Sequence, residues 1–512
     1  MPEYLAPGVF IEEIERGPRP IEGVSTSTAA FLGETERGPV TPRLVTSFNE
    51  YRRYFGGAFA PDRYMPDAVS GFFENGGRRA YICRIINEDA ATAVVAIGPI
   101  TFEAVGPGEW GNRVYVKLSA DSATRGTEKE AESKAFRLQV AYWDRLPEAG
   151  DPPDPFAGKG LPLPSLTEDF DNLNWGDPTS PDYWIKRLDG SSSLIRVANP
   201  GVILTERPPL GNLTKLTGGT PGGDVGFDDF VGLSGDDLRT GISALEQDEY
   251  REIALVAAPG VAIPEVNKKI FEHCQRNRFR FAVIDSPASI ADIGKYEPRT
   301  DWDTEYAAVY LPWIYGNDLR SGMRRLMPPS GHVLGVYART DIERGVWKAP
   351  ANEIVRGAVD LRYYIDTGKQ EILNPRGVNV IRRFPGRGIR VWGARTLSSN
   401  ALWKYVPVRR LFIFLERSIY EGTQWVVFEP NDEKLWERVK DTIRLFLRTQ
   451  WRNGAMMGLT EDEAFTIACD RSTMTQDDIL NGRLICEIGI APVRPAEFVI
   501  FRIFQNTAEA QN

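Results

Sequence analysis

Ser330, His332 and Asp285 are the residues whose types could form a hydrolytic site. A serine nucleophile needs a histidine base within reach and a carboxylate to orient it, and the chain has only two histidines, His273 and His332. The Gly-x-Ser-x-Gly turn of many hydrolases is absent, because Ser330 follows two prolines. We predict that Ser330 to His332 form a turn before a buried helix. A cytoplasmic serine hydrolase using Ser330, His332 and an aspartate remains the alternative.

Other residues that could hold a metal ion or a phosphate lack the required spacing. His273 and Cys274 lie on an amphipathic stretch with no second ligand pair nearby in the sequence. A group of carboxylates without EF-hand spacing predicts a solvated loop and comprises Glu168, Asp169, Asp171 and Asp177. The glycine-rich stretch 216–224 predicts a linker, because no Lys-Ser or Lys-Thr pair follows at phosphate-loop spacing. We expect no catalytic residue, no metal and no cofactor.

The cysteines and the N-terminal sequence indicate the cellular compartment in which the protein is made. The four cysteines lie far apart in the sequence without a Cys-x-x-Cys pair, so neither a disulfide framework nor a zinc site is indicated. They are Cys83, Cys274, Cys469 and Cys486. Residues 1–30 show no charged region followed by an apolar one, and no apolar run approaches about 18 residues. We expect synthesis in a cytoplasm and no insertion into a membrane.

The length of the chain predicts several domains, and its charged residues predict an uneven distribution of surface charge. A chain of 512 residues with 42% hydrophobic residues exceeds one hydrophobic core, so we expect two to four domains. The net charge of -9 argues against a general nucleic-acid binder. The segment 373–453 holds 13 Arg and 3 Lys against 5 Glu and 2 Asp, which leaves the remainder strongly acidic. This asymmetry suits contact between unlike surfaces of neighbouring copies, unless it is a chance excess of solvated arginines.

The elements that must position these residues alternate between strands and helices. Strands are expected at 28–33, 79–85, 253–260 and 279–285, and helices at 47–57, 65–75 and 264–277. Ser47 is the expected N-cap of the first helix, with Glu50 at capping-box spacing. The later strand, helix and strand predict a parallel sheet covered on both faces. Alternating segments and proline-rich loops between 90 and 222 predict an inserted β-rich domain.

The C-terminal segment predicts two helices followed by two strands. Pro407 suits the first turn of a helix that Gly422 ends, and Asn431 is expected to cap the next helix. The outer face of that second helix carries Lys434, Arg438, Lys440, Asp441 and Arg444. Closing strands are expected at 484–490 and 498–504. The last strand is apolar on both faces, so it needs a partner on one side or both.

Both ends of the chain hold candidates for strand exchange between copies. The N-terminal candidates follow a Pro-Gly break and precede a proline-rich tether; they are Val9, Phe10, Ile11 and Ile14. The C-terminal candidates are Phe498, Ile500, Phe501 and Ile503. An extended segment on a stiff tether could add a strand to the sheet of another copy, and pairing within its own sheet is the alternative.

Several ordered runs resemble the tail sheath family of contractile phages and related injection systems. They are 4–9 (YLAPGV), 25–33 (STSTAAFLG), 347–352 (WKAPAN), 357–361 (GAVDL), 372–381 (ILNPRGVNVI), 388–396 (GIRVWGART) and 491–498 (APVRPAEF). Because they span nearly the whole chain in order, the resemblance is more specific than any single motif.

The resemblance implies a structural subunit and not an enzyme. Sheath proteins stack as hexameric rings around an inner tube, and their N- and C-terminal arms complete the sheets of neighbouring subunits. A baseplate releases the extended lattice, which contracts and drives the tube through a membrane. The implied partners are further copies, an inner tube protein, baseplate and terminator or cap proteins, with a sheath paralogue left open. No contact with nucleic acid is expected.

The resemblance also sets the expected domains and sites. The fold class is α/β and α+β multidomain, with an α+β core built from both chain ends, a subtilisin-like α/β domain without protease function, and a β-rich insertion. The expected segments are an arm at 1–22, core at 23–90, insertion at 91–222, α/β domain at 223–372, C-terminal core at 373–504 and a frayed tail at 505–512. Candidate tube-facing residues are Lys434, Arg438, Asp441 and Arg444. The particle, a phage tail or an injection system, would assemble in a bacterial cytoplasm.

Overall fold

The computed structural model describes residues 20–126, 133–147, 150–158, 160–235, 238–261 and 263–502. It divides into a larger unit, Ser25–Arg409, and a terminal unit, Met1–Val24 with Arg410–Asn512. The predicted N-terminal strand residues Val9, Phe10, Ile11 and Ile14 lie outside the described residues, as does Ile503. The predicted frayed tail at 505–512 also lies outside them.

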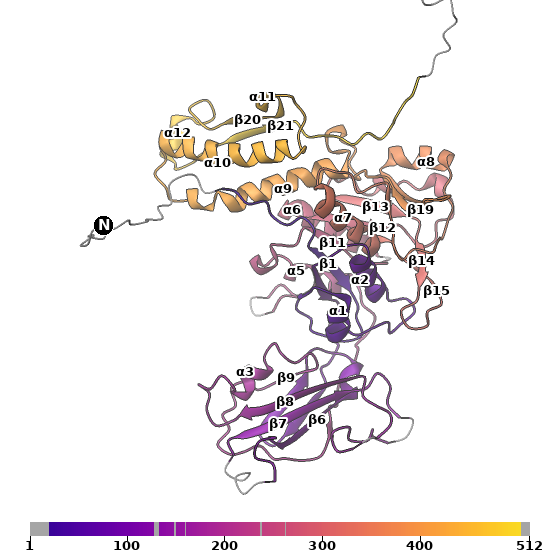
Figure 1. Ribbon diagram of the computed structural model, residues 1–512, viewed down its shortest axis with the longest axis vertical. Helices are drawn as coiled ribbons and strands as arrows, with labels where there is room; N and C mark the ends of the chain where they lie inside the picture. Colours follow the sequence, from indigo (N-terminus) through magenta and orange to yellow (C-terminus); the bar gives the residue numbers. More distant parts are fainter. Residues whose placement is uncertain are drawn as a thin grey trace, which may run out of the picture. The chain divides into compact units, whose positions relative to one another are not determined.

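The larger unit is built on a nine-stranded sheet of order β16-β19-β18-β13-β12-β11-β1-β3-β2 (Figure 1). Its strands are β1 (Ala29–Gly33), β2 (Arg43–Val45), β3 (Ala80–Arg84), β11 (Leu255–Ala257), β12 (Phe281–Asp285), β13 (Ala307–Leu311), β16 (Glu353–Ile354), β18 (Val378–Phe384) and β19 (Gly388–Trp392). The run from β3 to β18 pairs in parallel, and the outer strands pair antiparallel. The predicted parallel sheet is therefore confirmed. A separate three-stranded sheet joins β14 (Ile314–Asn317), β15 (Arg324–Met327) and β17 (Asp360–Leu361).

The described helices of this unit are α1 (Phe48–Phe55), α2 (Met65–Glu74), α4 (Phe227–Val231), α5 (Gly241–Ala244), α6 (Pro264–Asn277), α7 (Ser330–Arg344) and α8 (Thr367–Leu373). The sequence predicts α1, α2, α6 and the buried helix α7, but not the short helices α4, α5 and α8. The predicted N-cap of α1 is confirmed, because the Ser47 side chain accepts a hydrogen bond from the Glu50 amide at 3.1 Å. The Glu50 carboxylate instead accepts from the Thr46 amide at 2.7 Å, so the cap is not reciprocal.

Glycines let α2 and α7 pack in close contact. A Cβ added at Gly331 would lie 2.2 Å from the Ala68 carbonyl oxygen, and one added at Gly335 would lie 2.5 Å from the Phe72 carbonyl oxygen. Because α7 is buried from Ser330 to Thr340, this contact joins residues far apart in the sequence inside the core. The predicted turn before α7 is absent, since the helix begins at Ser330 itself.

A β-rich insertion lies within the range that the sequence predicts for it. One sheet has the order β10-β6-β7-β8 and a second has the order β4-β5-β9. The strands are β4 (Val94–Ile97), β5 (Ile100–Ala104), β6 (Val114–Ala120), β7 (Ala135–Tyr142), β8 (Leu166–Asn174), β9 (Ile195–Val197) and β10 (Thr214–Lys215), with one helix, α3 (Trp184–Leu188). Apolar side chains from both sheets share one core around Trp110, Phe136 and Trp184.

The predicted acidic loop of the insertion is wrong for most of its members. Glu168, Asp169 and Asp171 belong to β8, and Glu168 is only 7% exposed. Its carboxylate accepts hydrogen bonds from the Ser193 amide at 2.7 Å and the Ser193 hydroxyl at 2.6 Å. These bonds compensate for the burial of a charge, which is why a carboxylate occupies an inward position of a strand.

The basic strand pair β18 and β19 extends the sheet of the larger unit, whereas the sequence groups it with the C-terminal helices. β18 pairs in parallel with β13, from Val309 opposite Val378 to Leu311 opposite Val380. Val378 and Val380 are buried, so the apolar residues between the arginines decide where the strand packs. Charge counts over this segment do not reveal that partner.

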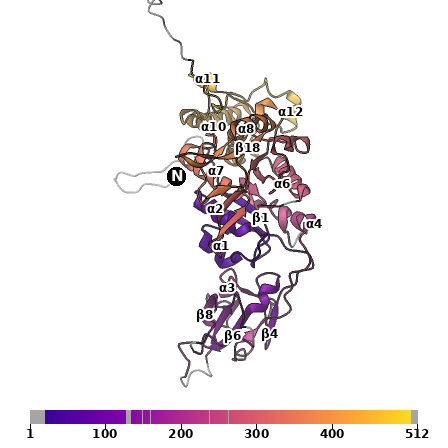
Figure 2. The same ribbon diagram turned by 90° about the vertical axis from the view of Figure 1, so that its right-hand side faces the viewer.

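The terminal unit contains α9 (Val406–Gly422) from Arg410 onward, α10 (Glu433–Arg452), α11 (Glu461–Ala464), β20 (Phe465–Ala468), α12 (Gln476–Leu480) and β21 (Glu487–Ile490). Figure 1 and Figure 2 show α11 and α12 beside α10. Asp432, and not the predicted Asn431, caps α10, because its carboxylate accepts from the Leu435 amide at 2.8 Å. Asn431 is engaged elsewhere and accepts a hydrogen bond from the Trp436 indole at 2.7 Å.

Candidate assembly interface

Ser330 and Asp285 are bonded to each other, but in a structural arrangement. The Ser330 hydroxyl donates to Asp285 Oδ2 at 2.7 Å, and the Ser330 amide donates to Oδ1 at 2.8 Å. The Gly260 amide donates to the same carboxylate at 3.1 Å. Burial raises the pKa of Asp285 to about 6, against the lowering effect of these bonds. Asp285 thus satisfies a backbone donor at the start of α7, and the fully buried Ser330 has no access to a substrate.

His332 does not complete a hydrolytic triad. Its ring faces Gly71, where an added Cβ would lie 2.4 Å from the ring, and its Nδ1 has no hydrogen-bond partner. Burial lowers the pKa of His332 to about 4, so the imidazole is neutral near pH 7. Since the Ser330 hydroxyl donates to Asp285, the structure does not support the hydrolase alternative.

The other histidine is also structural. His273 Nε2 lies 2.6 Å from Nη1 of the buried Arg280, and burial together with this cation lowers the pKa of His273 to about 3. Burial raises the pKa of the adjacent Cys274 thiol to about 12. Among the residues that the structure describes, no group of three or more His, Cys, Asp and Glu is placed to hold a metal ion.

The two-stranded sheet of β20 and β21 is a candidate site for added strands. The strands pair antiparallel, from Phe465 opposite Ile490 to Ala468 opposite Glu487. β20 lies against α10 and buries Phe465, whereas Glu487 and Gly489 of β21 are exposed. Within the described part of the chain no third strand joins this sheet. An incomplete sheet with unpaired edges is a template for another strand.

The chain leaves β21 through an exposed apolar segment. The exposed fractions are 73% for Phe498, 69% for Val499, 77% for Ile500 and 84% for Phe501. The strand predicted at 498–504 is not formed up to Arg502, and the remaining residues lie outside the described ones. Four consecutive exposed apolar side chains are typical of a surface that binds a partner.

The outer face of α10 partly matches the prediction. Lys434, Arg438 and Asp441 are exposed, and Arg444 is half-buried. The Arg438 guanidinium lies 4.7 Å from the centre of the Trp425 ring, and Arg444 lies 3.5 Å from a carboxylate oxygen of Glu461. Their contact with a tube stays a prediction, and intrachain contacts already hold the two arginines.

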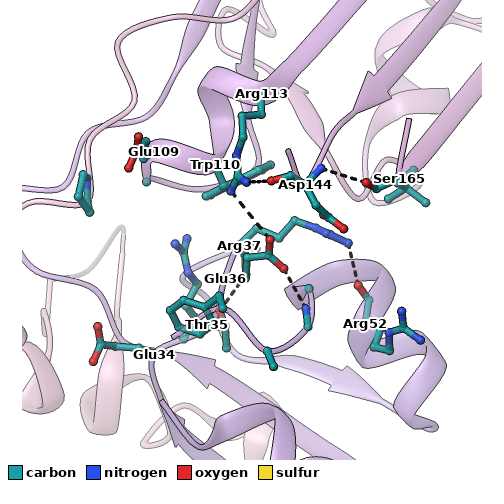
Figure 3. Close-up of a pocket in the computed structure, with 18 of the residues that line it drawn as sticks. Glu34, Thr35, Glu36, Arg37, Arg52, Glu109, Trp110, Arg113, Asp144 and Ser165 are labelled. Atoms are coloured by element: carbon teal, nitrogen blue, oxygen red, sulfur yellow. Dashed lines mark hydrogen bonds and ion pairs between the residues drawn. The ribbon is translucent and has the colours of Figure 1, made fainter. Parts of the chain in front are cut away.

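A polar cleft of 1170 Å³, here called the hinge cleft, lies where the β-rich insertion meets the loop after β1 and helix α1 (Figure 3). Glu36 and Arg37 approach it from the β1 side, and Arg113 and Asp144 from the insertion. The Tyr142 hydroxyl donates to Glu36 Oε1 at 2.9 Å, and the Arg37 guanidinium lies 4.9 Å from the centre of the Tyr142 ring.

A buried arginine forms a second link at the same place. Arg84 of β3 donates to the Gly38 carbonyl and to the Pro107 carbonyl of the insertion, each at 2.7 Å. Burial lowers the pKa of Arg84 to about 10, so the side chain stays charged near neutral pH. Since these contacts join segments distant in the sequence, they link the insertion to the rest of the larger unit at the hinge cleft, and composition gave no sign of them.

Two cysteines that the sequence treats as remote are brought together in the terminal unit. Cys469 follows β20 and Cys486 precedes β21, and interaction with the Cys486 thiol lowers the pKa of Cys469. The pairing of the two strands produces this contact, so only a correct prediction of their register could have found it.

No described helix has the length and apolarity needed to span a bilayer. In the comparison with protein families, residues 232–397 match the phage tail sheath protein central domain and residues 398–506 match the phage tail sheath C-terminal domain. The tail sheath protein of Burkholderia phage BcepMu is 22% identical over 479 residues, covering 88% of this chain and 87% of the relative.

Solved structures show the same mixed α/β multidomain fold. The sheath of PVC, an extracellular contractile injection system, in its contracted state gives a TM-score of 0.59 at 23% identity and covers 99% of this chain and 100% of that one. The contracted helical sheath of the anti-feeding prophage gives 0.59 at 23% identity, covering 98% and 99%. A crystal structure of a sheath tail protein from Listeria innocua gives 0.58 at 12% identity, covering 92% and 96%. With two family models that together cover more than half of its length, this chain belongs to the phage tail sheath family of contractile structures.

Proposed function

We propose that this chain is a sheath subunit that stacks as hexameric rings around an inner tube and contracts to drive that tube through a target membrane. In this proposal its terminal segments add strands to the sheets of neighbouring copies. The family supports the sheath role, and the similar solved structures include a baseplate and a helical sheath of the anti-feeding prophage. Further partners are the tube protein and a terminator or cap protein.

The observation that carries the proposal is that the terminal unit contains both an incomplete sheet and an exposed apolar segment. β20 and β21 offer backbone donors and acceptors along their outer edges. The segment from Phe498 to Phe501 offers a strand-forming sequence whose side chains are at least 69% exposed. A segment from another copy, laid along such an edge, gains backbone hydrogen bonds and covers apolar surface.

The energies favour a lattice over isolated pairs of subunits. Burial of four large apolar side chains contributes on the order of 1.5–3 kcal/mol each. Ordering the backbone costs about 1–2 kcal/mol per residue, so one added segment yields a net gain of only a few kcal/mol. Repetition around rings and along the cylinder multiplies that gain, and a difference in packing between extended and contracted lattices supplies the work.

The remaining predictions about organisation belong to the same proposal. The α/β part at 223–372 is compared with subtilisin, without protease function, and the arm is placed at 1–22. Strand residues Val9, Phe10, Ile11, Ile14, Phe498, Ile500, Phe501 and Ile503 are proposed to pair between copies. Lys434, Arg438, Asp441 and Arg444 are proposed to face the tube. The subunit would assemble in the bacterial cytoplasm as part of a phage tail or an injection system.

Deletion of each arm tests strand exchange. Removal of residues 1–14, or of residues 498–512, should leave folded monomers that form no striated cylinders by electron microscopy. Removal of 505–512 alone is the matched control and should leave assembly intact. Circular dichroism of each variant checks that the remainder is folded. Cylinders of normal length from either arm deletion would refute the proposed exchange.

A further inference from the structure

Cys469 and Cys486 lie one position beyond the last pair of the β20–β21 ladder. The paired register ends with Ala468 opposite Glu487, and one further step in the same register would place the two cysteines opposite each other. Directly opposite residues of an antiparallel pair have Cα atoms about 4.5–5.5 Å apart. A disulfide requires about 4.4–6.8 Å, so a continuation of this register would meet its geometric requirement.

The two thiols carry no disulfide, and they differ in burial and in pKa. Both are free thiols, with Cys469 buried and Cys486 half-buried. The hydrogen bond from Cys486 lowers the pKa of Cys469, burial opposes this, and the ammonium group of Lys440 lowers it further. The same hydrogen bond, with burial, raises the pKa of Cys486. Cys469 is therefore the sulfur that ionises first, with a second sulfur in contact.

We propose that Cys469 and Cys486 form an oxidation site at which a peroxide closes an intramolecular disulfide. The Cys469 thiolate attacks one oxygen of hydrogen peroxide, the O–O bond breaks, and Cys469 becomes a sulfenic acid. The other oxygen leaves as hydroxide, which takes up the proton released when the thiol ionised and becomes water. The Cys486 sulfur then attacks Cys469, its proton is transferred to the departing hydroxyl, and a second water leaves. Two thiols are oxidised and one peroxide is reduced.

The other two cysteines are internal controls for this chemistry. Cys83 and Cys274 are fully buried, and burial raises the pKa of each to about 12. Neither is thiolate near neutral pH, and they lie on different elements, β3 and α6. A peroxide should therefore consume two of the four thiols and leave these two intact.

The disulfide would stabilise the hairpin of β20 and β21, which precedes the C-terminal segment. Its effect on assembly rests on the proposed strand exchange. The bond would close the loop that contains α12 and tie the start of β21 to the end of β20, and from the other end of β21 the chain continues to Phe498. Closing a loop of about 15 residues should lower the opening equilibrium of this hairpin on the order of 100-fold. If the segment pairs with a neighbouring copy, the disulfide resists its withdrawal under load.

Thiol titration of the full chain before and after hydrogen peroxide tests the site. We expect four thiols to fall to two in denatured protein, a cross-linked peptide joining Cys469 to Cys486, and slower amide exchange in β20 and β21, all reversed by dithiothreitol. Cys486→Ser should lose only one thiol and should trap a sulfenic acid at Cys469 with dimedone. Its half-buried position tolerates the change.

Three results would overturn the site: four thiols after oxidation, a persistent sulfenic or sulfinic acid in the wild-type protein, or cross-links between chains. The outcome is separable from the proposed function. Loss of the thiols without cylinders in the assembly assay would reject strand exchange and keep the disulfide. Cylinders that form without loss of the thiols would keep strand exchange and reject the disulfide.

Discussion

Gly335→Ala should destabilise the larger unit, although alanine favours helices. A Cβ at position 335 would lie 2.5 Å from the Phe72 carbonyl oxygen, 2.6 Å from Asn75 Cβ and 3.1 Å from Phe72 Cα. Two of these neighbours are backbone atoms of α2, so relief requires the helices to separate. Overpacking of this kind costs about 1–3 kcal/mol, and the backbone carbonyl oxygen of Phe72 at 2.5 Å places it at the upper end. The helix propensity gained is about 1 kcal/mol, so the net loss should be about 1–2 kcal/mol.

Gly368→Ala is the matched control, because it makes the same exchange in helix α8. There the nearest atom to an added Cβ is Asp366 Oδ1 at 3.6 Å, an ordinary contact. We expect this variant to be unchanged or stabilised by up to about 1 kcal/mol. Differential scanning calorimetry compares the midpoints, with a shift of roughly 2 °C or less per kcal/mol in a unit of this size. A Gly335→Ala midpoint at or above that of the wild type would refute the close-contact reasoning.

Two further predictions follow from buried groups. Because burial raises the pKa of Asp285 from 3.8 to about 6, the folded state binds its proton more tightly, and this contribution to stability is lost as pH rises from about 4 to 6. Relative to wild type, Asp285→Asn should therefore gain on the order of 2–3 kcal/mol across that window in urea titrations, and a constant difference would contradict this. Tyr142→Phe removes the hydrogen bond to Glu36 and keeps the ring beside Arg37. Limited proteolysis should therefore cleave the linker 217–223 roughly 10-fold faster than in the wild type. Tyr115→Phe, which loses a bond to Asp151 inside the insertion, should not accelerate it.

Local patterns predicted the elements that depend on neighbours in sequence. The cap of α1 by Ser47 and the extent of α6 follow from short-range chemistry, and the structure confirms both. The cap of α10 was placed one residue too early, because Asn431 and Asp432 are both good caps. Only the Trp436 indole, which engages Asn431, decides between them.

Contacts between segments distant in the sequence determine the features that local patterns did not predict. Glu168 is in a strand because Ser192 and Ser193, more than twenty residues away, supply its hydrogen bonds. The pair β18 and β19 joins the larger sheet through β13. The Cys469–Cys486 contact depends on a register of two short strands, where a slip of one residue would turn the thiols to opposite faces. Each of these depends on a partner that no local window contains.

The contrast between the two sheets indicates where a contractile subunit can change. The nine-stranded sheet has its central strands buried on both faces, and α2 and α7 meet there at backbone contact, so rearrangement inside it would expose a large apolar area. The β20–β21 sheet has two short strands, exposed positions and a net gain of only a few kcal/mol for each added segment. The larger unit should therefore move as a rigid body during contraction, while the proposed strand-exchange contacts would hold adjacent copies together. A single bond between Cys469 and Cys486 would then act at the weakest element of the subunit, where its effect on the mechanical connection is greatest.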